Sequence, residues 1–351
     1  MKISFIGTVG VPNCYGGFES FVEACAPEIA NQGHEVHVTC DAQRYASKEN
    51  FWRGVQRHFI SIPANNLWSI PHDLVAFFAV VWRTDTVVVL GVSGGIWFPL
   101  MRLVCNLLRV RLIVNIDGVE WRRGGSLPKR SLLYFSDRLA QFFSHAVVFD
   151  NAALSKYVIW TKKAKSKMIP YPGDYPQPVG DTHPGDRPEA PYALTICRIE
   201  PENNCDLLLE SVANSDINNY VFIGNWQSST YGKGLLDRYA HHPGFQLLDP
   251  IYDQERITAF RNSCSVYLHG HSVGGTNPSL VEMLFYDCPI IAYDCSFNRA
   301  TAASGALFFR SRDELVSTLN QLPSLPSCDR SRIRVIYTRD KICEDYIAFS
   351  R

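Results

Sequence analysis

The sequence predicts an α/β protein made of two Rossmann-like, doubly wound domains that face each other across a cleft. Short apolar runs rich in β-branched residues alternate with helical patterns along most of the 351 residues. Strands that helices cover on both faces are expected to be such continuous apolar runs, and the alternation favours parallel sheets. A stretch rich in Pro, Gly and Asp, residues 170–191, separates two sets of these runs and suits neither a helix nor a central strand.

Each side of this break carries five predicted strands. They span residues 3–6, 36–39, 87–90, 112–115 and 146–149 before the break, and 193–196, 220–223, 245–248, 266–269 and 290–293 after it. Helices are expected over about 18–31, ending at Gly33, and over 333–349. The sequence therefore predicts an N-terminal domain over 1–170, a linker over 171–191, a second domain over 192–332 and a final helical segment over 333–351.

Composition and charge narrow the class of protein. The hydrophobic fraction of 46% is typical of a globular protein, and the formal net charge of zero argues against a dedicated nucleic-acid binder. Eleven cysteines occur without a CxxC pair, which indicates a reduced, cytoplasmic setting with neither disulfides nor structural zinc. The apolar region 74–92 is interrupted by Arg83, Asp85 and Gly91, so no transmembrane helix is expected, and the first strand is too short for a signal peptide.

The segment from Gly270 to Glu282 reads GHSVGGTNPSLVE and follows a strand-like run. Asn277 and Pro278 are strong helix-start signals, so the first helical turn would offer N–H groups and the positive end of a dipole to an anion. The paired glycines before them allow a ligand to approach the backbone closely. Glu282, one turn further on, could bind hydroxyl groups beside a phosphate, and a nucleotide sugar has both. The alternative is a turn that binds nothing.

A second glycine-rich loop, from Gly7 to Glu19, joins the first predicted strand to the first helix. Its glycine spacing differs from that of the dinucleotide-binding fingerprint, and it lacks the Gly-Lys-Ser/Thr of a P-loop. A long loop at the carboxyl end of a strand could contact an acceptor and a diphosphate together. The alternative is a plain connector.

Arg198 directly follows the predicted strand 193–196. A guanidinium at the carboxyl end of a parallel strand suits a diphosphate, because its forked donors match the phosphate oxygens. An ion pair with Glu200 or Glu202 is the alternative interpretation.

Two further groups of polar side chains follow predicted strands. Asp117 and Glu120 come after the strand 112–115, where a carboxylate could act as a base, bind sugar hydroxyls or simply cap the chain. His269 and His271 flank the glycine-rich turn and could bind a metal, but no third ligand is obvious. We therefore expect the two histidines to line a polar site, and we expect no metal.

Together these motifs resemble those of the family-four retaining glycosyltransferases, which have two Rossmann-like domains in the GT-B architecture. The chain looks most similar to a bacterial branch that begins G-x-G-x-P-x-x-Y-G-G-F-E and includes rhamnosyltransferases of capsule, O-antigen and cell-wall polysaccharide assembly. The matching residues of this opening are Gly7, Gly10, Pro12, Tyr15, Gly16, Gly17, Phe18 and Glu19. Three more motifs of the branch match residues 117–122, 197–204 and 270–282, so the resemblance covers nearly the whole chain.

The resemblance implies a role for each motif. Donor binding would fall to Gly16, Gly17, Arg198, Asn203, His271, Gly275, Thr276, Asn277, Pro278, Ser279, Leu280 and Glu282. Acceptor binding would fall to Tyr15, Phe18, Glu19, Glu120, Trp121 and Arg122. Asp117, beside the reacting sugar, and Arg198, on the diphosphate, would be catalytic. Two positions depart from the family pattern: Gly274 stands where a first motif glutamate is usual, and Asn203 where a lysine is usual.

The implied reaction is transfer of a sugar, with retention, from a nucleotide-diphosphate donor to a glycan or lipid-linked glycan in bacterial surface polysaccharide synthesis. The branch implies L-rhamnose from dTDP-rhamnose. Arg198 and the helix start at Asn277 would stabilise the charge that grows on the leaving phosphate, so neither a metal nor another cofactor is expected. Because no convincing second carboxylate is present, front-face attack is favoured over the double displacement of retaining hydrolases. The resemblance also implies that the last helix returns to the N-terminal domain.

The N-terminal half shows a pattern typical of membrane-surface helices. Apolar and aromatic residues lie beside Arg and Lys over 97–111 and 122–143, and the alternative is ordinary core helices with basic edges. We expect a cytoplasmic protein in peripheral contact with the anionic inner face of the cell membrane, with no nucleic-acid partner.

Three other functions fit parts of the sequence. A nucleotide-sugar epimerase of the same fold would need more acid–base side chains than the motifs offer. A non-catalytic nucleotide-sugar binding protein is compatible with the missing glutamate at Gly274. An NAD-dependent oxidoreductase is disfavoured, because the G-x-G-x-x-G and its acidic ribose partner are missing.

Overall fold

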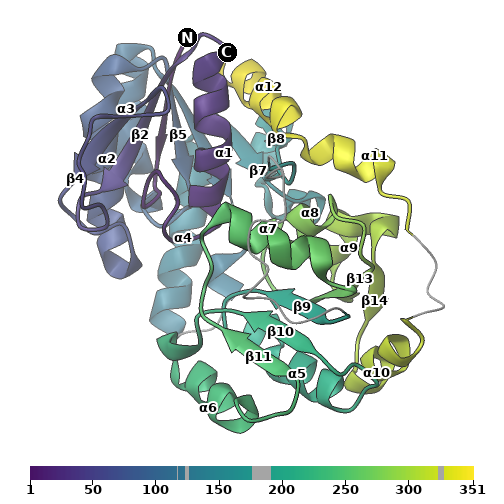
Figure 1. The fold of residues 1–351 in the computed structure, drawn as a ribbon. Coiled ribbons are helices and arrows are strands. Elements are labelled where there is room, and N and C mark those ends of the chain that lie inside the picture. The colour runs from purple at the N-terminus through teal and green to yellow at the C-terminus, as the bar shows by residue number, and fades with distance from the viewer. Residues whose placement is uncertain (117, 123–125, 176–190, 323–327) are drawn as a thin grey trace. The chain divides into compact units, whose positions relative to one another are not determined.

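The computed structural model describes residues 1–351 except 117, 123–125, 176–190 and 323–327. The chain forms two compact units (Figure 1). Unit 1 comprises Met1–Pro172, Gly274–Thr276 and Tyr337–Arg351, and unit 2 comprises Gly173–Val273 and Asn277–Ile336. Each unit contains one sheet flanked by helices, so the predicted α/β class is confirmed.

Unit 1 is built on an eight-stranded sheet of order β3-β4-β2-β1-β5-β6-β7-β8, in which only the β3–β4 pair is antiparallel. The strands are β1 (Lys2–Ile6), β2 (Glu35–Asp41), β3 (Phe51–Trp52), β4 (Val55–Ile60), β5 (Thr86–Leu90), β6 (Arg111–Ile116), β7 (Ala146–Phe149) and β8 (Ser166–Met168). The five strands predicted here are confirmed. The sequence pattern does not predict β3, β4 and β8, which lie toward the edges of the sheet and are short or rich in polar residues.

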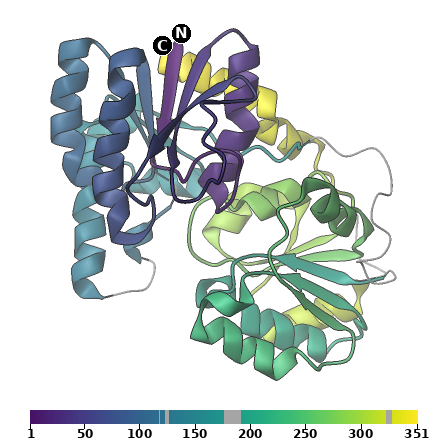
Figure 2. The ribbon, with the colours of Figure 1, turned by 60° about the vertical axis from the view of Figure 1, so that its left-hand side comes forward.

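Helices cover both faces of this sheet (Figures 1 and 2). They are α1 (Gly17–Asn31), α2 (Ser69–Val80), α3 (Phe98–Leu108), α4 (Leu127–Phe143) and α12 (Arg339–Ser350). Helix α1 buries Phe21, Val22 and Cys25, because its apolar residues recur at helical spacing and face the β1–β2 core.

The end of the chain closes the core of unit 1. Tyr346 of α12 is buried against the rings of Phe5 and Phe21, and its hydroxyl accepts a hydrogen bond from Asn115 Nδ2 at 2.8 Å. The two termini lie side by side in both ribbon views (Figures 1 and 2). The single helix predicted over 333–349 is in fact two, α11 (Ser331–Arg334) and α12, because the backbone is extended at Thr338.

Unit 2 is built on a six-stranded, wholly parallel sheet of order β11-β10-β9-β12-β13-β14. The strands are β9 (Ala193–Ile196), β10 (Tyr220–Ile223), β11 (Phe245–Leu248), β12 (Val266–His269), β13 (Ile290–Tyr293) and β14 (Leu307–Phe309). Its helices are α5 (Cys205–Ala213), α6 (Thr230–Tyr239), α7 (Gln254–Ser263), α8 (Pro278–Met283), α9 (Ser296–Ala302), α10 (Arg312–Asn320) and α11. All five strands predicted for this part are confirmed, and β14 is additional.

Both sheets have a point at which the strand order reverses. In unit 1, β1 lies between β2 and β5, and in unit 2, β9 lies between β10 and β12. Open α/β sheets bind ligands outside the carboxyl ends of the strands at such a reversal. A ligand site is therefore expected at the loops after β1 and β5 in unit 1 and at the loops after β9 and β12 in unit 2.

Two smaller observations complete the fold. All eleven cysteines are free. None of the helices in the described ranges combines the length and the apolar character needed to cross a membrane.

Candidate functional site

The loop after β9 presents Arg198 to solvent. The side chain of Arg198 is exposed, and it takes part in none of the ion pairs that the described residues of unit 2 form, so neither Glu200 nor Glu202 neutralises it. Its carbonyl is held instead, since it accepts hydrogen bonds from Asn203 Nδ2 at 2.7 Å and from the Glu200 N–H at 3.0 Å. Hydrogen bonds thus fix the backbone of Arg198, while the N–H donors of its guanidinium group remain available.

Hydrogen bonds tie the loop after β9 to the loop after β12. Asn203 Oδ1 lies 2.7 Å from His271 Nδ1, and Asn204 Nδ2 donates to the Gly270 carbonyl at 2.7 Å. Because the Asn203 amide nitrogen already donates to Arg198, its oxygen is the acceptor, so His271 carries its proton on Nδ1. The asparagine that replaces the expected lysine therefore connects two of the predicted donor-binding residues.

Gly270 allows these two loops to pass closely. A Cβ at this position would lie 2.2 Å from the Asn203 carbonyl oxygen, which no side chain tolerates without a backbone shift. The Ser272 N–H and hydroxyl both donate to the Glu202 carbonyl, at 2.9 and 2.8 Å. The result is a stiff pair of loops at the β9–β12 reversal.

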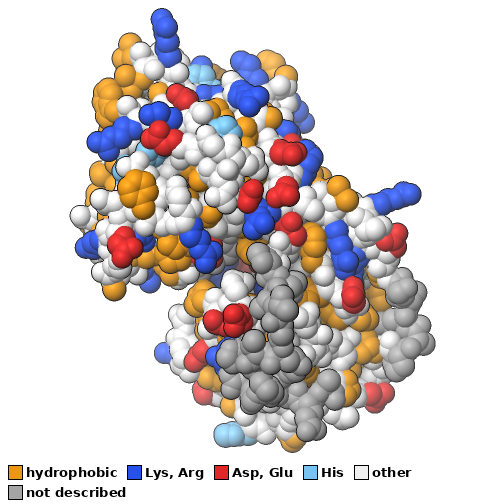
Figure 3. All heavy atoms as spheres, turned by 45° about the horizontal axis from the view of Figure 1, so that its top comes forward, with side chains coloured by type: hydrophobic (Ala, Val, Ile, Leu, Met, Phe, Trp, Pro, Cys, Tyr) orange, Lys and Arg blue, Asp and Glu red, His pale blue; other side chains and the backbone are white. Residues whose placement is uncertain are grey.

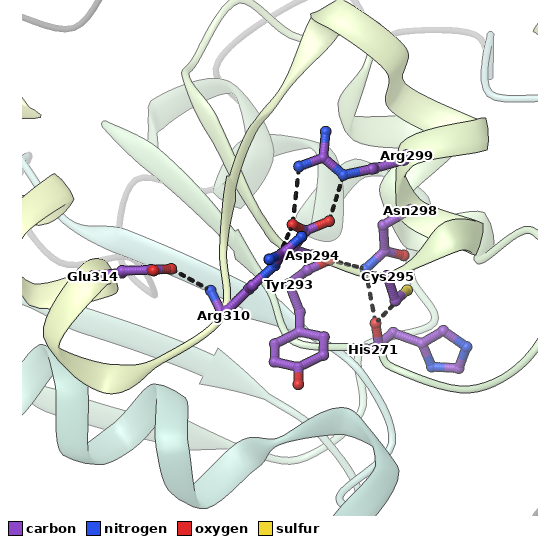
Figure 4. Close-up of polar contacts among 8 residues, drawn as sticks. All are labelled: His271, Tyr293, Asp294, Cys295, Asn298, Arg299, Arg310 and Glu314. Carbon is purple, nitrogen blue, oxygen red and sulfur yellow. Dashed lines mark hydrogen bonds and ion pairs between the residues drawn. The ribbon is translucent and has the colours of Figure 1, made fainter.

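The end of β13 adds a set of charges that the sequence did not indicate (Figure 4). The Asp294 carboxylate pairs with the guanidinium groups of Arg299 and Arg310, whose donors lower the pKa of Asp294 to about 2. Asn298 Nδ2 donates to the carbonyl of His271 at 2.7 Å and to that of Tyr293 at 2.8 Å. A carboxylate directly after a predicted buried strand is the signal that would have identified Asp294.

Helix α8 begins as predicted, with Asn277 as its N-cap and Pro278 at its first position. The Asn277 side chain accepts a hydrogen bond from the Ser279 N–H at 3.0 Å, and the Asn277 carbonyl accepts one from the Leu280 N–H at 3.1 Å. Pro278 has no N–H to offer. An anion at this end of the helix would have to displace the Asn277 side chain from the Ser279 N–H. Fewer backbone N–H groups are therefore free to bind an anion than the sequence suggested.

Gly275 and Thr276 belong to the short segment Gly274–Thr276, which is part of unit 1. The Thr276 N–H donates to Asp150 Oδ2 at 2.8 Å and its hydroxyl donates to the Asp150 carbonyl at 2.5 Å, while Asn151 Nδ2 donates to the hydroxyl at 3.2 Å. A Cβ on Gly275 would lie 2.5 Å from Asp150 Oδ1. Neither Asp150 nor Asn151 was predicted as a site residue, although both directly follow the predicted strand 146–149.

Glu282 is buried and forms an ion pair with Arg261 of α7. Burial raises the pKa of the Glu282 carboxyl, and the guanidinium of Arg261 opposes that rise. The carboxylate expected to bind hydroxyl groups of the donor therefore has a protein partner that the motif did not reveal. Arg261 lies outside every motif, so no sequence signal would have found it.

The glycine-rich loop after β1 is supported from within by Glu19. Its carboxylate is only 4% exposed and accepts hydrogen bonds from the Thr8 hydroxyl at 2.6 Å and the Val9 N–H at 2.7 Å. The structure thus uses Glu19 to hold the loop, whereas the sequence led us to expect it at an acceptor. Tyr15, by contrast, is half exposed and Phe18 is partly buried, and Gly16 and Gly17 form the start of α1.

The segment after β6 packs through Trp121. Its indole N–H donates to Asp137 Oδ2 at 3.3 Å, and its ring meets that of Tyr134 edge-on at 5.2 Å. Arg122 donates to the Tyr157 hydroxyl at 2.7 Å. Asp117 lies outside the described residues, and of Glu120 only its place in the turn Glu120–Arg122 is described.

No metal-binding group emerges from the described residues, among which no three His, Cys, Asp or Glu side chains are placed to hold an ion. His269 is buried, and burial together with the neighbouring His271 lowers its pKa well below the ordinary value. A neutral His269 is compatible with the predicted polar lining beside the loops after β9 and β12.

Known proteins resemble this chain in two ways. Residues 1–174 match a family model described as "Domain of unknown function (DUF1972)". No curated protein sequence matches the chain significantly. Solved structures do match over nearly the full length, at low sequence identity.

Sucrose-phosphate synthase from Thermosynechococcus elongatus superposes with a TM-score of 0.72 at 14% identity, over 99% of this chain and 96% of that one. HepE from Anabaena, solved in complex with UDP, also gives 0.72 at 14% identity, over 99% of both chains. A UDP-forming trehalose-phosphate synthase from Burkholderia vietnamiensis gives 0.68 at 12% identity, over 100% and 99%. The chain has the GT-B fold that these glycosyltransferase structures share.

Proposed function

We propose that this protein is a glycosyltransferase that moves a sugar from a nucleotide-diphosphate donor to a glycan or lipid-linked glycan. The observation that carries the proposal is the β9–β12 reversal of unit 2, where an exposed, unneutralised Arg198 lies on a loop braced by Asn203. The matching structures support the donor class, since one contains UDP and another is named for forming it.

Arg198 has the chemistry that departure of a nucleoside diphosphate requires. Negative charge grows on the leaving phosphate, and a guanidinium carried on a backbone that hydrogen bonds hold in place would stabilise it without the need for a metal. The proposed reaction retains the configuration of the sugar by front-face attack, with Asp117 beside the reacting carbon. L-rhamnose from dTDP-rhamnose, in bacterial surface polysaccharide synthesis, is the donor and setting we propose from the motif resemblance.

An anionic membrane is the proposed location of the acceptor. Residues 86–172 contain thirteen Lys and Arg but four Asp and Glu, and two of these acids, Asp137 and Asp150, are buried. Large apolar side chains are exposed on α3, on α4 and in the turn Trp160–Lys165, among them Leu103, Leu107, Phe135, Phe142 and Trp160. Figure 3 shows a face with a different pattern, where Lys and Arg are interspersed with Asp and Glu. A cationic, apolar surface suits attachment to anionic lipid.

The decisive experiment is a product assay with purified protein, a panel of nucleotide sugars and lipid-linked glycan acceptors. Release of nucleoside diphosphate that depends on the acceptor supports the proposal. A donor that binds, seen as a rise in the thermal unfolding temperature, without transfer or hydrolysis would instead indicate a non-catalytic binding protein. Conversion of the sugar without any acceptor would indicate an epimerase.

A further inference from the structure

Two cysteines of unit 2 lie in contact at the amino-terminal edge of its sheet. Cys264 ends α7 just before β12, and Cys288 lies just before β13, the parallel neighbour of β12. The Cys264 thiol donates a hydrogen bond to the Cys288 sulfur at 3.5 Å. The two sulfur atoms would have to approach each other by about 1.5 Å to reach the bond length of a disulfide.

The guanidinium of Arg330 is held beside Cys288. Its Nη2 donates to the carbonyl of Cys288 at 2.9 Å, its Nη1 to that of Tyr286 at 2.6 Å and its Nε to that of Gly305 at 2.8 Å. Arg330 is only 6% exposed, and it takes part in none of the ion pairs formed by the described residues. A buried cation without a carboxylate partner favours a thiolate nearby.

The two thiols are therefore not equivalent. The hydrogen bond from Cys264 lowers the pKa of the Cys288 thiol, and the charge of Arg330 acts in the same direction, against the effect of burial. The thiolate is the form of cysteine that attacks oxidants. Cys288 is also the more accessible of the two, since it is partly exposed whereas Cys264 is buried.

We propose that Cys264 and Cys288 are a redox-active pair that closes a disulfide when the protein meets a peroxide, with Cys288 as the attacking sulfur and Cys264 as the resolving thiol. The Cys288 sulfur attacks one oxygen of hydrogen peroxide, the O–O bond breaks, hydroxide leaves and a sulfenic acid forms. Cys264 then loses its proton and attacks the Cys288 sulfur, the S–O bond breaks and the second hydroxide leaves. The two thiols supply two protons and two electrons, and one peroxide becomes two waters. None of these steps involves the proposed sugar transfer.

The bond would join the two ends of the segment 264–288, which contains β12, the motif from Gly270 to Glu282 and α8. A cross-link of this kind removes conformations from the unfolded chain. Oxidised wild-type protein should therefore unfold at a higher temperature than reduced protein, and peroxide should leave the unfolding temperature of Cys288→Ser unchanged. Equal temperatures for the two forms of the wild type would show that the bond does not restrain this segment.

Peptide mapping tests the pairing itself. Wild-type protein is treated with a small molar excess of hydrogen peroxide, the remaining thiols are alkylated under denaturing conditions, and the peptides are identified by mass spectrometry. The expected product is a peptide cross-linked between Cys264 and Cys288 that is lost on reduction with dithiothreitol. Absence of this peptide, or disulfides scattered among other cysteines, would overturn the proposal.

A second thiol pair of unit 2 is an internal control. The sulfur atoms of Cys197 and Cys205 lie 4.0 Å apart, and their contact together with burial raises the pKa of the Cys197 thiol well above its ordinary value. This pair should stay reduced under the same treatment. Equal oxidation of the two pairs would show that sulfur contact alone governs the reaction, and the role given to Cys288 would be wrong.

Variants test the order of the two steps. Cys264→Ser removes the resolving thiol, so dimedone should label Cys288 as a sulfenic acid, whereas Cys288→Ser should leave Cys264 reduced. Labelling of Cys264 in Cys288→Ser would reverse the roles and contradict the proposal. Cys295→Ser removes another partly exposed thiol of unit 2 and should form the disulfide as the wild type does. Mapping of the wild-type protein decides the pairing even if a variant does not fold.

Discussion

Arg198 differs from three other arginines of unit 2 because it is exposed and has no carboxylate partner among the described residues. Arg299 and Arg310 are paired with Asp294, and Arg261 is paired with Glu282. Of these four guanidinium groups, the one on Arg198 needs to break no ion pair before it binds a phosphate.

Replacement of Arg198 by Ala should therefore reduce kcat by roughly 100- to 1,000-fold, as loss of a transition-state donor typically costs about 2.7–4 kcal/mol. Steady-state kinetics with the donor and acceptor found in the product assay measures this. Arg238→Ala, which removes an exposed arginine paired with Asp206, is the control and should leave kcat unchanged. Turnover by Arg198→Ala at the wild-type rate would exclude the role proposed for this residue.

Asp294 should make the stability of the protein depend on pH in the acid range. Its pKa of about 2 lies below the ordinary value of 3.8, so the ionised form stabilises the fold above about pH 4, and this contribution is lost as the pH falls toward 2. Asp294→Asn should unfold at a lower temperature than the wild type at pH 6, and the difference should shrink between pH 4 and 2. Thermal unfolding followed by circular dichroism across this range tests it, and a difference independent of pH would contradict it.

At the scale of elements, the loops after β9 and β12 act as one structure. Asn203 and Asn204 bridge to His271 and Gly270, and Ser272 bonds to Glu202. Because the two loops pass so closely at Gly270, the addition of a single methyl group at this residue would disturb their arrangement.

Gly270→Ala should lower the free energy of unfolding by about 1–3 kcal/mol, because the added Cβ forces the backbone of Asn203 to move. It should also weaken donor binding by displacing the loop that carries Arg198. Gly234→Ala is a matched control in α6, where a Cβ meets nothing within 4 Å, and a gain of about 0.5–1 kcal/mol is expected there. Denaturant unfolding of both variants checks this, and equal stabilities would show that the loops tolerate a shift.

The strands were predictable because buried parallel strands appear in the sequence as continuous apolar runs. All ten predicted strands are present, whereas β4 was missed because Gln56 and His58 interrupt its apolar residues on a half-buried face. The N-cap at Asn277 was predictable for a similar reason, since a local hydrogen bond produces it. Partners that lie far apart in the sequence were not predictable, such as Arg261 with Glu282 and Asp150 with Thr276.

At the scale of the whole molecule, formal neutrality hides an uneven distribution of charge. The excess of Lys and Arg in residues 86–172 is balanced by acidic residues elsewhere in the chain. The exposed apolar residues of α3 and α4 belong to this cationic part.

The membrane proposal predicts binding to vesicles of phosphatidylcholine with 30% phosphatidylglycerol, and weak binding to phosphatidylcholine alone. Binding should fall as salt is raised, because the attraction to anionic lipid is screened. Leu107→Glu should reduce binding several-fold, since Leu107 is 76% exposed on α3. Phe51→Glu alters an exposed residue outside the cationic segment and should bind as the wild type does. Co-sedimentation measures both, and equal binding to neutral and anionic vesicles would contradict the proposal.

The sequence by itself determined the α/β class, the order of the main strands and the positions of the glycine-rich and arginine-bearing loops. These features follow from periodicity and local turn chemistry, which act over a few neighbouring residues. Only the tertiary structure decided which of the candidate side chains are available to a ligand. It left Arg198 exposed, turned Glu19 inward to hold its own loop and gave Glu282 a guanidinium partner, because burial and long-range pairing depend on residues that the fold alone brings together.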